Sequence, residues 1–219
     1  MSFKTLLLFS IGLVLNFQTL SGFAQVDPKA EELLTQVSKK YEAIKSYKAS
    51  FSYQLENPQA KVNEKSAGEI NVKGEKYNLK LGNQEIINNG TTVWTYLKEE
   101  NEVNVSDYTP DDDEVVPTKI YSMYKQGFKY ALVEEEKGEK GAVYQVVDLV
   151  PENKKKPYFK IRLWISKKDK SIAKWKIFEK NGNRYLFTIS NFQPNAKLSD
   201  DLFSFDKDKY KGVEVVDLR

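Results

Sequence analysis

The side chains that could carry out chemistry in this sequence are carboxylates and lysines, because its 219 residues include neither histidine nor cysteine. Their absence excludes nucleophilic sites of the Ser-His-Asp or Cys-His type, and it excludes zinc sites built from Cys and His. Disulfides are excluded too, so the fold must depend on its hydrophobic core alone. Carboxylate-based or lysine-based catalysis stays possible.

The densest run of carboxylates is Asp111 to Glu114, directly after Pro110. Oxygen-rich loops can bind calcium, and paired acids can hydrolyse glycosides. The run lacks the alternation and the glycine of an EF-hand loop. We therefore favour a solvated connecting loop over a calcium site or a secreted carboxylate-based enzyme. We expect no catalytic residue, no metal and no cofactor.

The overall charge is nearly balanced, with 34 basic and 31 acidic residues and a formal net charge of +3. This balance does not indicate a nucleic-acid partner. Aromatic residues make up 13% of the chain, a share that suits β-strands or an aromatic-lined surface.

The first 24 residues have the pattern of a secretory signal peptide. Lys4 supplies the positive charge, Thr5 to Phe17 is mostly apolar, and the small residues Gly22 and Ala24 precede an expected cleavage after Ala24. The alternative is an uncleaved N-terminal anchor. No cysteine follows the cut, so we expect no lipid attachment. Residues 25–219 are expected to form one soluble, exported, monomeric domain.

Most of that domain is predicted to be antiparallel strands. Within Gly68 to Tyr96, apolar residues alternate with polar ones and are separated by turns, of which Asn89-Gly90 is the strongest hairpin signal. Further strands are expected at 47–55, 102–109, 143–150, 159–165, 171–179 and 185–189. Turn signals recur along the chain, which predicts one large curled antiparallel sheet.

Two helices are predicted beside this sheet. Asp27 to Lys45 places its apolar residues at spacings of three and four, with Asp27 as the N-cap and Pro28 at the first helical position. Pro117 to Tyr130 suggests a shorter helix that is broken near Gly127. Periodicity does not distinguish a helix that covers one end of a sheet from a lid over a ligand cavity.

Five stretches resemble, in order, those of one known family. Ser46 to Phe51 is a strand that follows the amphipathic helix. Gly68 to Lys73 is similar to the family's Gly-x-apolar-x-Val-Lys strand, and Asn88 to Tyr96 to its hairpin ending in Trp-x-Tyr. Asp201 to Phe205 and Lys211 to Asp217 resemble its Phe-x-Phe and Gly-Val-x-Val ending. The mature chain thus resembles the periplasmic outer-membrane lipoprotein carrier (LolA) family.

The resemblance implies a mainly β (α+β) fold, in which a curled antiparallel sheet forms an incomplete barrel closed by amphipathic helices. It implies a soluble periplasmic carrier, not an enzyme, that holds the acyl chains of lipoproteins in an apolar cavity on the way from inner to outer membrane. Its partners would be acylated lipoproteins, an inner-membrane lipoprotein-releasing transporter and an outer-membrane acceptor. Each CH₂ buried is worth about 0.8 kcal/mol, so acylated proteins need a carrier to cross water.

Alternation along the strands suggests which residues line such a cavity, although plain core is the alternative for each one. The predicted cavity residues are Phe51, Tyr53, Ile70, Val72, Tyr77, Leu79, Ile86, Trp94, Leu163, Ile165, Trp175, Ile177, Phe187 and Ile189. The predicted lid residues are Leu33, Leu34, Val37, Ile120, Met123 and Tyr124.

The sequence departs from the family pattern in two places. The family often carries Arg-Pro after Val-Lys, and that arginine helps to hold the lid closed, whereas Gly74-Glu75 stands there in this chain. Asp206 to Tyr210 replaces a proline-rich step near the C-terminus. An alternative function is therefore a binding module of the same fold for another lipid, another apolar ligand or a signalling partner.

Overall fold

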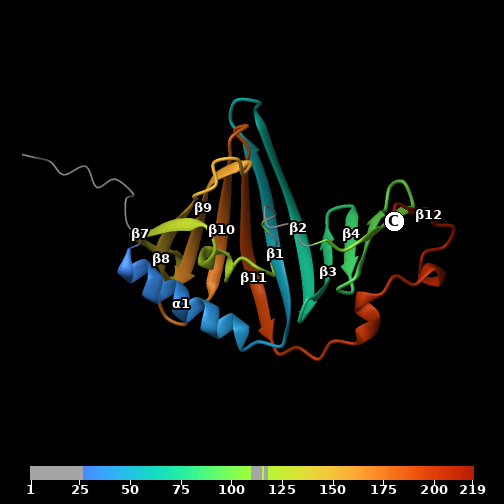
Figure 1. The fold of residues 1–219 in the computed structure, drawn as a ribbon, viewed down its shortest axis with the longest axis horizontal. Coiled ribbons are helices and arrows are strands. Elements are labelled where there is room, and N and C mark those ends of the chain that lie inside the picture. Colours follow the sequence, from blue (N-terminus) through green and yellow to red (C-terminus); the bar gives the residue numbers. More distant parts are fainter. Residues whose placement is uncertain (1–26, 110–114, 116–117) are drawn as a thin grey trace, which may run out of the picture.

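A computed structural model of the protein describes residues 27–109, 115 and 118–219. They form one sheet of twelve strands with the order β12-β6-β5-β4-β3-β2-β1-β11-β10-β9-β8-β7 (Figure 1). The strands are β1 (Ser46–Asn57), β2 (Val62–Lys73), β3 (Lys76–Leu81), β4 (Gln84–Asn88), β5 (Thr92–Leu97), β6 (Glu102–Asp107), β7 (Phe128–Lys137), β8 (Val143–Pro151), β9 (Tyr158–Ser166), β10 (Ile172–Glu179), β11 (Arg184–Pro194) and β12 (Glu214–Asp217).

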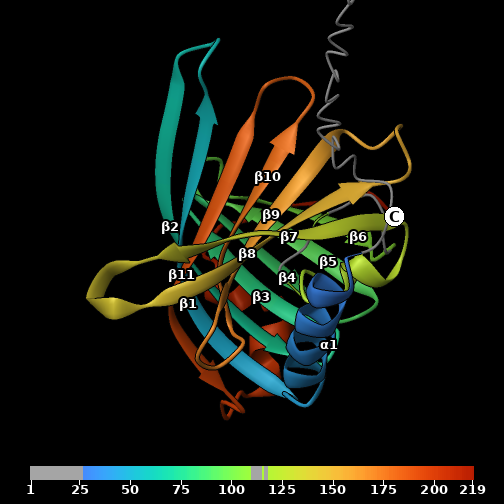
Figure 2. The same cartoon turned by 90° about the vertical axis from the view of Figure 1, so that its left-hand side faces the viewer.

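The sheet curls (Figure 2). It does not close, because β12 and β7 are its two ends, lie at opposite ends of the molecule in Figure 1, and are not paired with each other. Neighbouring strands are antiparallel except β12, which runs parallel to β6. The prediction of one curled sheet is confirmed. The parallel C-terminal strand was not expected, since Lys211 to Asp217 carried no pairing signal in the sequence.

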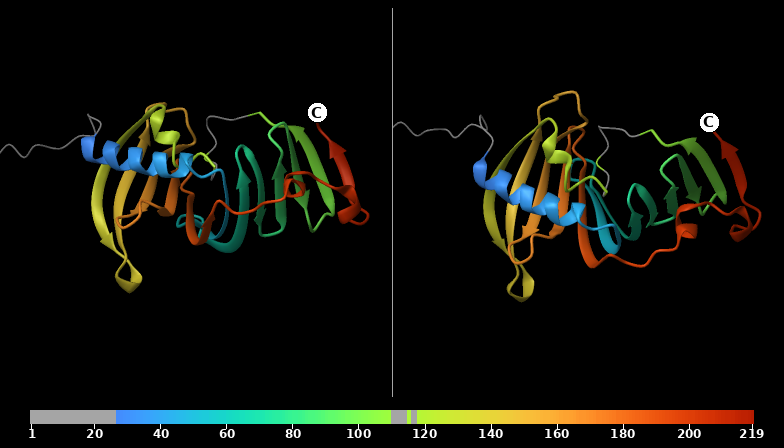
Figure 3. Two further views of the ribbon diagram at one scale, coloured as in Figure 1. Left: turned by 90° about the horizontal axis from the view of Figure 1, so that it is seen from below. Right: turned by 60° about the horizontal axis from the view of Figure 1, so that its bottom comes forward.

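Helix α1 (Pro28–Glu42) confirms the first predicted helix. The Asp27 carboxylate accepts hydrogen bonds from the backbone N–H of Lys29 and of Leu132, both at 2.9 Å. One side chain thus caps the helix and fastens its start to β7. Figure 3 shows α1 across the inner side of β7–β11, whereas β3–β6 lie beyond the end of the helix.

The second predicted helix, Pro117 to Tyr130, is wrong. Its described part contains only the short 3-10 helix η1 (Met123–Lys125), and β7 starts at Phe128. Gly127 has φ +67°, a left-handed conformation that ends the helical turn. Closure of the sheet by helices is therefore not observed, since α1 is the one α-helix among the residues that the structure describes.

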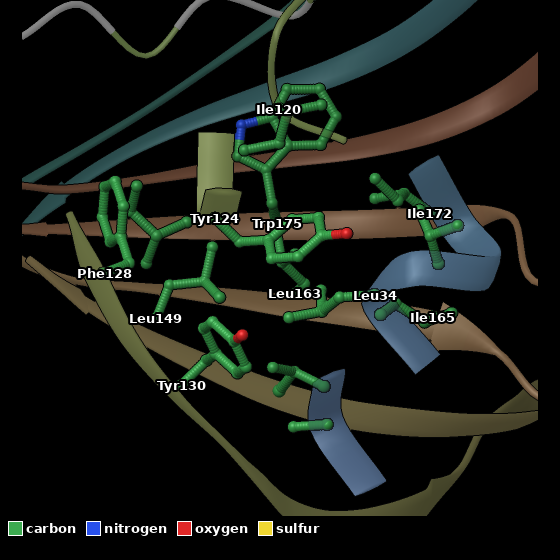
Figure 4. Packing of buried hydrophobic residues seen from close by; sticks show 14 of the residues in the cluster. Leu34, Ile120, Tyr124, Phe128, Tyr130, Leu149, Leu163, Ile165, Ile172 and Trp175 are labelled. Atoms are coloured by element: carbon green, nitrogen blue, oxygen red, sulfur yellow. The ribbon is translucent and has the colours of Figure 1, made fainter. Parts of the chain in front are cut away.

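Two apolar clusters share the inner side of the sheet. The larger joins α1 and Ile120 to the inner residues of β7–β10, and Figure 4 shows Leu34 facing Leu163 and Ile165. The smaller consists of Tyr47, Ala49, Phe51, Ile70 and Val72. Phe187 and Ile189 pack against both clusters, so β11 connects them.

The predicted signal peptide and the Asp111 to Glu114 run lie outside the described residues. No helix in the part of the chain that the structure covers is long and apolar enough to cross a bilayer.

Candidate functional site

The two clusters meet at an apolar pocket on the inner side of the sheet. The space open to a water-sized molecule inside it is ≈ 30 Å³. Its walls come from α1, the segment before η1, and strands β1, β2, β10 and β11. The lining residues are Tyr41, Tyr47, Ala49, Phe51, Ile70, Ile120, Ile172, Trp175, Phe187, Ile189 and Phe192.

Strand β1 supplies one wall through residues two apart, Tyr47, Ala49 and Phe51, which share one face of the strand. Phe51 lies opposite Gly68 on β2. A Cβ atom at Gly68 would lie 2.4 Å from Cζ of Phe51 and 2.9 Å from the carbonyl oxygen of Lys80. Gly68 is therefore required there because the phenyl ring of Phe51 occupies the space above it.

Strand β11 supplies the opposite wall and contains an irregularity. Phe51 pairs with Ile189, but Ala49 pairs with Phe192, so the β11 strand has one extra residue at this point. Such a bulge reverses the inside–outside alternation. It brings Phe192 to the same side as Ile189, three positions away, where it contacts the rings of Tyr41 at 5.7 Å and Tyr47 at 5.2 Å.

A row of aromatic rings leads from the pocket along the inner face. The indole of Trp175 stacks on Phe187 with centroids 4.8 Å apart and planes 11° apart. Phe187 contacts Tyr53 at 5.1 Å, and Tyr53 stacks on Tyr185 at 6.1 Å. These rings form a continuous apolar surface whose polar atoms are few.

The segment before η1 is held to α1 beside the pocket. The rings of Tyr41 and Tyr121 stack at 5.3 Å with planes 9° apart. The Ser38 hydroxyl donates to the carbonyl of Tyr121 at 2.7 Å, and Lys125 pairs with Glu42 at 2.5 Å. These contacts hold Ile120 in the wall of the pocket.

The hydroxyl of Tyr41 accepts a hydrogen bond from the backbone N–H of Ile172 at 3.0 Å. Burial raises the pKa of Tyr41 to about 12 and also raises the pKa of Tyr47. Both side chains are therefore neutral at ordinary pH, and none of the described residues that line the pocket carries a charged side chain.

Most of the predicted cavity residues lie on the inner side of the sheet. Phe51, Ile70, Trp175, Phe187 and Ile189 line the pocket. Tyr53, Val72, Tyr77 and Leu79 belong to the smaller cluster or pack against it. Ile86 is in register with Leu79 and so has the same face. Leu163, Ile165 and Ile177 are buried core against α1 and do not line the pocket.

The prediction that Trp94 lines the cavity is wrong, because the strand register puts Trp94 on the outer side of the sheet. Trp94 pairs with Ile87 and Val105, and Ile87 in turn pairs with Asn78. Thr95 instead pairs with Ile86, which shares the inner face with Leu79. The sequence Val93-Trp94-Thr95 alternates equally well either way, and the hairpin register decides which side faces inward.

The predicted lid residues all lie within the larger cluster or against it. Leu33, Leu34, Val37, Ile120 and Tyr124 are buried there, and Met123 packs on its border. Of these, only Ile120 lines the pocket. The α1 residue that reaches the pocket is instead Tyr41, one helical turn after Val37.

Sequence reasoning missed several lining residues. Tyr47 and Ala49 could have been found by extending the alternation of Phe51 backward along the same strand. Phe192 could not, because the bulge in β11 has no sequence signal. Ile172 could not be found by alternation either, because the pairing of β10 with β9 shifts register between Ile172 and Lys174.

A second pocket lies on the outer side of the sheet and is larger, with ≈ 430 Å³ open to water. It lies beneath the C-terminal segment 198–210, and charged side chains such as Lys48, Glu85 and Asp206 line it. Those charges make it unsuitable for an acyl chain. No group of three or more potential metal ligands occurs in the described portion of the chain.

Comparisons with known proteins agree with this architecture. The family model described as "Outer membrane lipoprotein carrier protein LolA" matches residues 42–206. A comparison with curated proteins gives no significant match. Among solved structures, an uncharacterized conserved protein from Thermus thermophilus has 13% identity and a TM-score of 0.56 over 86% of this chain and 99% of that chain.

Two further structures are more distant. A LolA superfamily protein from Nitrosomonas europaea has 13% identity and a TM-score of 0.44, over 81% of this chain and 98% of that chain. The MucA/MucB complex of Pseudomonas aeruginosa gives 15% identity and a TM-score of 0.45, over 82% of this chain and 62% of that chain. At 13% identity, the similarity to the Thermus thermophilus protein concerns the fold alone.

Proposed function

This chain belongs to the outer membrane lipoprotein carrier protein (LolA) family, and from that premise we propose that it is an exported carrier of acylated lipoproteins. In this proposal it takes lipoproteins released by an inner-membrane transporter, crosses the periplasm as a soluble protein, and delivers them to an outer-membrane acceptor. The expected signal peptide at residues 1–24 supports export.

The observation that carries the proposal is the apolar pocket between α1 and the inner face of the sheet. Its walls are aromatic and aliphatic side chains contributed by both clusters. Such walls favour hydrocarbon at about 0.8 kcal/mol per buried CH₂ and make no hydrogen-bond demand on it. Transfer of an acyl chain between carriers breaks no covalent bond, so the proposal assigns the chain no catalytic step.

The small free volume makes the structure a closed state in this proposal. Ligand pockets usually measure about 300–1,000 Å³, whereas the space here is ≈ 30 Å³. An acyl chain therefore has to displace side chains that now fill the site. The segment that holds Ile120 is the element we propose to move, because it is fastened to α1 mainly by the Tyr41–Tyr121 stack, Ser38 and the Lys125–Glu42 pair.

These contacts would then take the role of the family's lid-holding arginine, whose position is occupied by Gly74-Glu75. Gly74 lies in the β2–β3 turn with φ +61°, and nothing lies within 4 Å of the position that its Cβ would take. A latch at that position is therefore not built here, and closure is assigned to α1 and the segment before η1.

Affinity purification from periplasmic extract tests the proposal. The protein should recover acylated lipoproteins, and Ile189→Gln in the pocket should reduce that recovery, while the matched change Val215→Gln at an exposed site should not. Recovery of non-acylated proteins only would contradict a carrier function. A free lipid identified by mass spectrometry would instead favour the alternative binding module.

A further inference from the structure

One buried polar group in the pocket has no partner. The indole Nε1–H of Trp175 finds no hydrogen-bond acceptor within the described residues, although the side chain is only 4% exposed. Buried donors are nearly always paired, because an unpaired donor loses its bond to water and gains nothing in return.

The surroundings explain why the protein does not satisfy this donor. Trp175 lines the pocket, and Figure 4 shows its indole on the side of the cluster where Ile120 lies. Among the described residues that line the pocket, the only side-chain oxygens are the hydroxyls of Tyr41 and Tyr47. The Tyr41 hydroxyl already accepts from the backbone of Ile172.

Another tryptophan of the same sheet shows that such a donor can be paired. Trp164, on the adjacent strand, donates its Nε1–H to a carboxylate oxygen of Glu136 at 2.6 Å. Its ring faces outward, where Glu136 also pairs with Lys174. The unpaired indole is therefore specific to the tryptophan that lines the pocket.

We propose that the Trp175 N–H donates a hydrogen bond to a carbonyl oxygen at the head of the bound acyl chain, in an ester or amide linkage. This inference rests on the proposed function and adds a specificity to it. Hydrocarbon contacts Phe187 and the neighbouring rings, whereas the acyl carbonyl pairs with the indole at about 2.7–3.2 Å. The pocket then distinguishes an acyl chain from an alkyl chain of the same length.

The stack on Phe187 supports this role. With centroids 4.8 Å apart and planes 11° apart, the two rings hold the indole plane fixed. A donor with a fixed direction selects ligands by geometry and loses little entropy on binding. Residues placed in this way favour a ligand whose acceptor lies at a defined point beside the hydrocarbon.

The test uses two ligands of equal chain length, a methyl fatty ester and the corresponding methyl alkyl ether, in displacement of a fluorescent apolar dye. The protein is the exported chain from Gln25, which keeps every described residue. Three proteins are compared: the parent, Trp175→Phe, and the matched control Trp94→Phe, whose ring lies on the outer face. The two ligands differ in hydration, and this difference affects all three proteins equally. The informative quantity is therefore the ester-to-ether affinity ratio of each variant divided by that of the parent.

The parent and the Trp94→Phe control should both prefer the ester, and Trp175→Phe should lower the ester-to-ether affinity ratio by roughly tenfold while binding the ether as the parent does. In parallel, the indole ¹⁵N–H resonance of Trp175 should shift on addition of ester and remain in place with ether.

An unchanged ratio in Trp175→Phe would overturn the inference and leave the carrier function standing. Failure of the parent to bind either ligand would overturn both. Equal weakening of both ligands in Trp175→Phe, with the affinity ratio preserved, would assign Trp175 to packing alone and would also overturn the inference.

Discussion

At the scale of single residues, the site depends on a close fit between a glycine and a phenylalanine on neighbouring strands. Phe51 lies over Gly68 at a distance that leaves no room for a Cβ atom. Phe51 belongs to the smaller cluster and also lines the pocket. The fit explains why β2 has a glycine at this position.

Gly68→Ala should destabilise the protein by about 1–3 kcal/mol, because the added methyl group forces Phe51 out of its present position. Denaturant unfolding followed by circular dichroism measures the change. Adding Phe51→Leu to the Gly68→Ala variant should recover part of the loss, since a smaller side chain tolerates the methyl group. Simple additivity of the two changes would show that the residues are not coupled.

The titration of Tyr41 makes the stability of the folded protein depend on pH. The unfolded tyrosine loses its proton near pH 10, whereas burial raises the pKa of folded Tyr41 to about 12. Between these values the folded state holds the proton and the unfolded state does not, so stability falls as pH rises. This residue should lower the unfolding free energy by up to about 3 kcal/mol by pH 12.

Urea unfolding at a series of pH values between 8 and 12 checks this prediction. Tyr41→Phe removes the titrating hydroxyl, and its unfolding free energy should fall less steeply with pH than that of the parent protein. Parallel curves for the two proteins would mean that Tyr41 titrates normally when folded. At pH 8 the unfolding free energy of the variant should be lower only by the loss of the hydrogen bond that Tyr41 accepts from the backbone N–H of Ile172.

At the scale of elements, α1 is positioned by its first residue as well as by its apolar stripe. Ala30, Leu33, Leu34 and Val37 are all at most 4% exposed, so the buried stripe fixes the rotation of the helix. The Asp27 carboxylate fixes its start, since it bonds to the helix at Lys29 and to β7 at Leu132.

Asp27→Ala should cost about 1–2 kcal/mol of stability, because the helix loses its cap and β7 loses an acceptor. Asp27→Asn keeps an acceptor oxygen and should lose less. The hydrogen bond from the backbone N–H of Leu132 lowers the pKa of Asp27. The ionised carboxylate therefore stabilises the folded protein fully at pH values above its ordinary pKa near 3.8, and this stabilisation is lost as pH falls through the lowered pKa. Thermal melts of the three proteins at pH 7 and pH 3 check both statements. Equal melting temperatures at pH 7 would contradict the anchoring role.

Helix α1 and the strands were predictable from local patterns, since capping, periodicity and turn residues act over a few positions. The helix expected at Pro117 to Tyr130 failed because Ile120, Tyr124 and Phe128 are four apart by coincidence. Phe128 and Tyr130 in fact alternate along β7, and Gly127 ends the turn before them. Spacing alone could not show which of the two periods the tertiary contacts would select.

The pocket was predictable only in part for a similar reason. Alternation identified Phe51, Ile70, Phe187 and Ile189. On β11, Phe187 and Ile189 precede the bulge. Phe192 depends on a bulge that alternation cannot reveal, and Trp94 depends on the register of a hairpin. Trp175 was predicted as a lining residue, but its unpaired N–H follows only from the arrangement of its neighbours.

At the scale of the whole molecule, one open sheet carries two sides of different chemistry. The inner side holds both apolar clusters and the pocket. The outer side of β8–β10 carries ion pairs and cations over rings, such as Arg162 with Asp148 at 2.6 Å and Lys174 over Trp164 at 4.4 Å. This division lets the protein offer hydrocarbon-binding surface on the inner side while the outer side of β8–β10 carries charged groups.

The central claim is that the inner pocket opens to receive acyl chains. The most direct measurement is the affinity of the chain from Gln25 onward for a synthetic acylated lipopeptide, compared with the same peptide lacking its acyl chains. Only the acylated peptide should bind, and Ile189→Gln should weaken its binding while Val215→Gln should not. Equal affinity for the two peptides would contradict it, because binding would then owe nothing to the acyl chains.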